Sequence, residues 1–109
     1  TMSDILKSYG TASVGITPVV VYTAPPTKSA VVIGANIANL LDVNIYVTIK
    51  VNKGGTPFTI LRKVFIPPGC AYIWSGAEQK IVLDPNDTFT IVSDTALSCD
   101  ILVSVSEIV

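Results

Sequence analysis

The sequence contains no histidine among its 109 residues. Histidine is the commonest general base and metal ligand near neutral pH, so its absence excludes Ser-His-Asp and Cys-His catalysis and histidine metal sites. The remaining routes need paired carboxylates or an activated lysine, and nothing in the sequence pairs the two glutamates, Glu78 and Glu107. We therefore expect a protein that is not an enzyme, with no catalytic residue, no metal ligand and no cofactor.

Charged residues are also scarce, at 14% of the chain against about 25% in an average soluble domain. The formal net charge is −1 and neither sign forms a run, whereas nucleic-acid-binding proteins usually carry a basic stretch. We expect no nucleic-acid partner, and we interpret the adjacent Arg62 and Lys63 as a solvated strand edge or as salt-bridge partners. So few charges leave part of the surface apolar, which predicts that a partner covers it.

Long apolar runs are missing, so no segment approaches the ~18 residues of a membrane span, and we expect no membrane partner. The segment from Thr1 to Lys7 lacks the basic and apolar regions of a signal peptide, which predicts a protein made in a cytoplasm. The chain has only two cysteines, Cys70 and Cys99. In a chain without an export signal, two free thiols are favoured over a disulfide.

Apolar and polar residues alternate along most of the chain, and no segment of useful length shows the 3.6-residue period of a helix. Residues 43–51 are the clearest example, with apolar side chains at every odd position and mostly polar ones between. This pattern predicts a strand half-buried in an antiparallel sheet. The same test predicts eight strands in all, at about residues 18–23, 29–39, 43–51, 58–66, 71–74, 79–83, 87–93 and 97–105.

Turn residues separate these strands. Two glycines in Asn52–Thr56 suit a hairpin loop, Pro67-Pro68-Gly69 predicts a type II turn, and Asp84–Asp87 predicts a type I turn. Such spacing predicts an all-β fold, a two-sheet antiparallel sandwich that is jelly-roll-like or immunoglobulin-like, and the strand count favours the jelly roll. We expect residues 1–15 to form a flexible N-terminal arm and residues 16–109 a single β-sandwich domain.

Several strands carry large apolar side chains on the face opposite their apolar one. Either these are central strands covered by loops, or the second face belongs to a subunit interface, and the low charge favours the interface. The candidate interface residues are Val20, Tyr22, Leu61, Phe65, Tyr72 and Trp74. A different class of function remains open, because Tyr72 and Trp74 together resemble a stacking platform for a carbohydrate or another ligand.

Three oxygen-bearing side chains, Asp84, Asn86 and Asp87, lie close together in the turn before residue 88. Such groups are calcium ligands, but no EF-hand loop surrounds them and no glutamate completes the set. A plain hairpin turn is therefore favoured over a calcium site.

Nearly the whole chain, from about residue 18 to residue 108, resembles a known family. The resemblance is carried by five segments: Val21–Pro26, Ser29–Asn39, Val64–Gly69, Ile81–Asp87 and Ser106–Ile108. Together they look like the small β-sandwich structural proteins of tailed-bacteriophage virions, which serve as capsid decoration (cement) subunits or as neck and tail accessory parts. Asn86 stands where such turns often carry glycine, and asparagine tolerates the left-handed geometry.

The resemblance implies no catalytic residues and a function in the virion. It implies a capsid decoration protein, a homotrimer that binds the major capsid protein or other virion proteins and stabilises the phage head. The alternative within the same family is a neck, tail or fibre module. In either position the protein would be assembled in the host bacterial cytoplasm and would remain in the virion.

Overall fold

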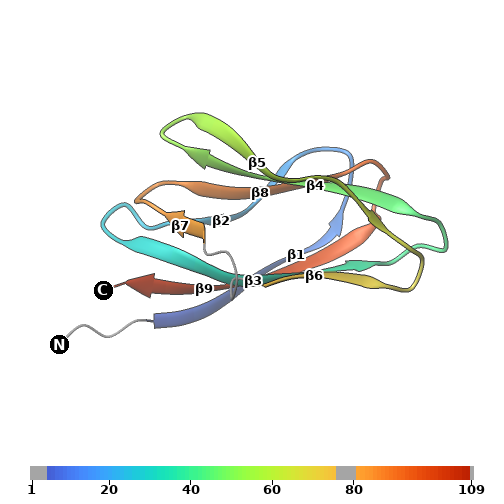
Figure 1. The fold of residues 1–109 in the computed structure, drawn as a ribbon, viewed down its shortest axis with the longest axis horizontal. Helices are drawn as coiled ribbons and strands as arrows, with labels where there is room; N and C mark the ends of the chain where they lie inside the picture. The colour runs from blue at the N-terminus through green and yellow to red at the C-terminus, as the bar shows by residue number, and fades with distance from the viewer. Residues whose placement is uncertain (1–4, 76–80, 109) are drawn as a thin grey trace.

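The computed structural model describes residues 5–75 and 81–108, and the described residues form an all-β fold of two antiparallel sheets. Figure 1 shows the two sheets as two layers, one above the other. The predicted antiparallel sandwich is therefore confirmed. The strands are β1 (Ile5–Val14), β2 (Val19–Thr23), β3 (Ser29–Asn39), β4 (Ile45–Lys53), β5 (Thr56–Ile66), β6 (Ala71–Ser75), β7 (Ile81–Leu83), β8 (Thr88–Ser93) and β9 (Cys99–Ile108).

The strand order identifies the kind of sandwich. Sheet A has the order β1-β9-β3-β6, with β7 also paired to β3, and sheet B has the order β2-β8-β4-β5. Four antiparallel pairs, β1 with β9, β2 with β8, β3 with β6 and β4 with β5, run from the two chain ends inward. A chain paired in this way is one long hairpin rolled into two sheets, which is a jelly roll.

The core lies between the two sheets, and β4 shows why the sequence puts it there. Its residues Ile45, Val47, Ile49 and Val51 are all buried, while Tyr46 and Lys50 point outward. The predicted alternation is thus confirmed in this strand, although Val43 precedes the strand and is exposed. Because side chains alternate between the faces of a strand, one apolar set fills the core and the other positions remain on the surface.

In β3 the alternation changes phase, which the sequence pattern did not predict. Strict alternation along residues 29–39 would place the side chains of Val31, Ile33, Ala35 and Ile37 on one face, but the buried residues are Ala30 and Val32 and then Ala35 and Ile37. The register with β9 shifts between Val32 and Gly34. One extra residue at such a bulge moves the following side chains to the other face, so Ile33 points out of the sandwich.

Residues 5–14, which we expected within a flexible arm, form β1 at the edge of sheet A. The strand pairs with β9 in regular register from Ile5 opposite Glu107 to Thr11 opposite Ile101. Only Val14 of this strand is buried. The sequence pattern missed β1 because a strand exposed on most positions needs no apolar alternation.

Two predicted turns are confirmed by their backbone angles. Gly54 and Gly55 connect β4 to β5 with φ of 59° and 87°, and Gly69 has φ of 71° at the third position of the type II turn. The turn at Asp84–Asp87 differs from the prediction. Asn86 has φ of 72°, and a positive φ at the third position belongs to a type II turn and not to type I.

Candidate interaction surface

The structure does not bring the six candidate interface residues together. Tyr22 and Trp74 are buried in the core, and Leu61 and Tyr72 are partly buried and packed against it. Val20 and Phe65 are exposed. They lie on β2 and β5, which are the two opposite edges of sheet B, so β8 and β4 separate them.

The burial of Trp74 also bears on the ligand-binding alternative. Its side chain is only 9% exposed and belongs to the core cluster, while Tyr72 is partly buried against the same cluster. A stacking platform for a sugar needs exposed aromatic faces. In this structure Trp74 packs within the core and Tyr72 packs against it.

The outer face of sheet A carries a different set of exposed apolar residues. Paired residues of antiparallel strands point to the same face, so the registers place side chains in rows across the sheet. One row runs from Ile73 through Asn36 and Leu102 to Gly10, and a second runs from Val82 through Val31 and Ser106 to Leu6. We call the exposed aliphatic residues of this face the sheet A patch: Leu6, Ile33, Ile73, Val82 and Leu102.

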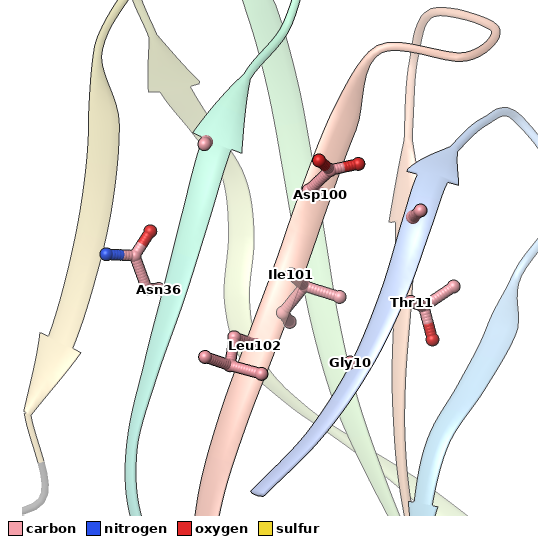
Figure 2. A pocket seen from close by; sticks show the side chains of 8 residues that line it. Gly10, Thr11, Asn36, Asp100, Ile101 and Leu102 are labelled. Carbon is pink, nitrogen blue, oxygen red and sulfur yellow. The ribbon is translucent and has the colours of Figure 1, made fainter.

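Small residues fill the spaces between these aliphatic side chains. Figure 2 shows Asn36, Leu102 and Gly10 side by side on β3, β9 and β1, where the surface has an open hollow of about 470 Å³. Among the described residues in the rows of this face, Asp100, at one end of the hollow, is the only charged one. Sheet B, in contrast, carries Lys50, Arg62 and Lys63 on exposed positions.

A buried carboxylate, that of Glu107, connects β9 to β1 and to β2. Glu107 of β9 is 2% exposed, and its Oε2 accepts a hydrogen bond of 2.8 Å from the Tyr22 hydroxyl. The Lys7 ammonium group of β1 lies 3.2 Å from Oε1 and forms an ion pair. The ring of Tyr9 packs on that of Tyr22 with centroids 4.8 Å apart. Lys7 and Tyr9 therefore fasten β1 to both sheets.

The cluster shifts the proton affinities of its members. The hydrogen bond from Tyr22, together with the nearby Lys7 charge, outweighs burial and lowers the pKa of Glu107 below its usual value. Burial raises the pKa of Tyr22, and the hydrogen bond to Glu107 raises it further. The hydrogen-bonding and charge interactions with Glu107 raise the pKa of Lys7. All three shifts keep Glu107 ionised and its two partners protonated at neutral pH.

This cluster predicts a loss of stability in acid. A carboxyl group whose pKa is lower in the folded state stabilises the fold above its unfolded pKa, and this contribution disappears as the pH falls through the folded pKa. We expect Glu107→Gln to be less stable than the unchanged protein at pH 7, with the difference shrinking below about pH 4. Urea unfolding of both proteins between pH 7 and pH 3 measures this. A difference that is constant over that range would contradict the account.

The two aspartates of the turn at residues 84–87, where a plain turn was favoured over a calcium site, pair with a lysine. The ammonium group of Lys53 lies 2.7 Å from Oδ2 of Asp87 and 3.2 Å from Oδ2 of Asp84. Although burial opposes it, Lys53 and the Asp84 backbone N–H lower the pKa of Asp87. The Lys53 ammonium group thus supplies the positive charge between the two aspartates, and it links the β4–β5 hairpin to the turn before β8. Across residues 5–75 and 81–108 there is no cluster of three or more potential metal ligands.

The two cysteines lie on opposite sides of β3. Cys70 is exposed, and its carbonyl oxygen accepts the backbone N–H of Asn39, which pairs on its other side with Cys99 of β9. With a strand between them the two Cα atoms are about 10 Å apart, which is too far for a disulfide. Both are free thiols, and burial raises the pKa of Cys99 to about 11.

Comparisons with known proteins provide information about the fold and not about the function. No protein-family model and no curated protein matches the chain. A chain of Bacillus endospore appendages, described as a novel family of disulfide-linked pili, is 14% identical, with 99% of this chain and 85% of that chain covered and a TM-score of 0.50. At this identity the likeness shows a shared fold alone.

A second solved structure has weaker similarity. A chain of infectious bursal disease virus, Gt strain, is 13% identical with a TM-score of 0.48, and we draw no argument from it. The alignment covers 98% of this chain but only 31% of the viral one. Within the part of the chain that the structure describes, no helix is long and apolar enough to cross a membrane.

Proposed function

We propose that this chain is a non-enzymatic structural subunit that associates with copies of itself through the sheet A patch. The observation that carries the proposal is the composition of that face. Ile73 is 71% exposed and Leu6 is 73% exposed, and small uncharged residues lie between the aliphatic ones. A large exposed apolar area with little charge is typical of a surface that a protein partner covers.

The specific form of the proposal is a decoration protein of a phage head that assembles as a trimer. The resemblance to virion β-sandwich proteins supports it, whereas the occurrence of the fold in a protein of disulfide-linked pili supports only the broader proposal of a structural subunit. The threefold symmetry comes from the resemblance, because decoration subunits occupy threefold positions of the shell. A closed cyclic trimer would cover the patch on every copy.

Such a subunit would act mechanically. Each trimer would contact several copies of the major capsid protein, and several modest contacts made by one rigid body add up to tight binding. A protein that binds the assembled shell better than its separate subunits stabilises the shell by mass action. A subunit of the neck, tail or fibre would use the same surface with a different partner.

Electron microscopy tests the position in the virion. Antibodies raised against this chain would be applied, with gold labels, to particles pelleted from the culture that produces it. We expect gold in a regular distribution over phage heads. Gold confined to necks or tails would favour the accessory position, and unlabelled particles would contradict a function in the virion.

A further inference from the structure

The outer edge of β1 is unusual among the edges of this sandwich. The edge strand β5 contains Pro57 and two shifts of register with β4, and Lys63 within it has φ of 50°. The edge strand β2 has five residues and a register shift with β8. Prolines, bulges and shortness are the features that keep an edge from pairing with another chain.

In β1 the register with β9 is regular over residues 5–11, and these residues include no proline. Within residues 5–75 and 81–108, β9 is the one strand that pairs with β1, so alternate backbone N–H and C=O groups of residues 5–11 face away from the sheet. An inward-pointing charge can also protect an edge. Here the inward-pointing charge of Lys7 already has a buried partner, Glu107, so a strand added beside β1 would leave no charge without a counterion.

We propose that β1 pairs with β1 of a second copy, antiparallel and around a twofold axis at Ser8. This contact uses the backbone edge of β1 and shares only Leu6 with the sheet A patch, whose residue Ile73 lies on β6 at the opposite edge of the sheet. An antiparallel pair of identical strands is a self-complementary contact of the kind that twofold symmetry produces. The two copies of sheet A would then continue as one sheet.

The side chains of β1 select this register. Side chains alternate between the two faces of a strand. The outer faces of both copies therefore lie on the same side only if the twofold axis places one residue opposite the same residue of the second copy. An axis at Lys7 places two like charges directly opposite each other, which is destabilising. An axis at Tyr9 places Ile5 opposite Ser13, beyond the register shift that follows Thr11. An axis at Ser8 pairs all of residues 5–11.

The register at Ser8 also fits the surface. It places Leu6 of one copy opposite Gly10 of the other, and both residues belong to the outer face. Leu6 is 73% exposed, and Gly10 lies in the hollow beside Leu102 (Figure 2). On the inner face, Lys7 of one copy lies opposite Tyr9 of the other, so this register places no like charges opposite each other.

The expected contact is weak in dilute solution, because one strand edge buries less area than a stable dimer needs. It would form where copies are held close together, as neighbouring trimers are on a shell. A chemical cross-link traps such a contact even when it is transient, and it does so without depending on the trimer interface.

The test is disulfide trapping. In a Cys70→Ser background, Ser8→Cys places two thiols directly opposite each other at the proposed axis. The matched control is Leu6→Cys, also exposed and on the same face, whose two copies would be about 13 Å apart along the strands. At high protein concentration under mild oxidation, we expect Ser8→Cys to run at twice the chain mass on a non-reducing gel and Leu6→Cys to stay mainly at the single-chain mass.

Circular dichroism would first show that both variants keep the strand content of the unchanged protein. Adding Leu6→Glu to the Ser8→Cys variant should remove the cross-linked band, because the carboxylate would lie over the apolar hollow of the other copy. Equal cross-linking of Ser8→Cys and Leu6→Cys would reflect random collision and would overturn the proposal. An absence of cross-linking in both would overturn it as well, whatever the molar mass of the unchanged protein in solution.

Discussion

Val47→Asp is expected to abolish folding or to reduce the folded fraction so far that little soluble protein is obtained. Val47 is 0% exposed, in the middle of the buried face of β4, between Val64 of β5 and Ser93 of β8. A carboxylate there has no counterion and costs about 3–5 kcal/mol or more. That is a large part of the roughly 5–15 kcal/mol that stabilises an ordinary domain.

The neighbouring residue provides the control. Thr48 points to the outer face of sheet B, and its Oγ1 accepts the backbone N–H of Lys63. An aspartate at this position keeps an acceptor for that hydrogen bond, so Thr48→Asp should change the free energy of unfolding by no more than roughly 0.5 kcal/mol. Urea unfolding followed by circular dichroism measures both variants. Equal destabilisation by the two would mean that both faces of β4 are buried.

The sequence was sufficient to predict the two-sheet architecture, because apolar alternation is a local signal that a half-buried strand must carry. The predicted strand at residues 29–39 coincides with β3. Two features were not predictable from alternation. The bulge at Ile33 depends on how β3 aligns with β9, and β1 is held by backbone pairing and by Lys7 and Tyr9, which no periodic pattern marks.

The candidate surface was harder to predict than the fold. Low charge correctly indicated an apolar surface, but the sequence could not distinguish an aromatic side chain that fills the core from one that faces a partner. Tyr22 and Trp74 fill the core. The residues of the sheet A patch come from five strands, β1, β3, β6, β7 and β9, and only the pairing of those strands brings them onto one face.

Ile73→Glu is expected to separate the proposed oligomer into single chains without unfolding them. Ile73 is 71% exposed on β6, so its side chain adds little to the core, whereas a carboxylate within an apolar interface would be buried without a partner. β3 and β9 separate β6 from β1, so the variant leaves the β1 edge unchanged. Val20→Glu is the matched control, an exposed apolar residue on sheet B.

The molar mass in solution tests the central claim most directly. Light scattering after size exclusion would be run on the unchanged protein, Ile73→Glu and Val20→Glu, at micromolar and at tenfold lower concentration. We predict about three times the 11.5 kDa chain mass for the unchanged protein and for Val20→Glu, and a single chain mass for Ile73→Glu. Dissociation by Val20→Glu alone would place the interface on sheet B, and an unchanged protein that is monomeric at both concentrations would contradict the account.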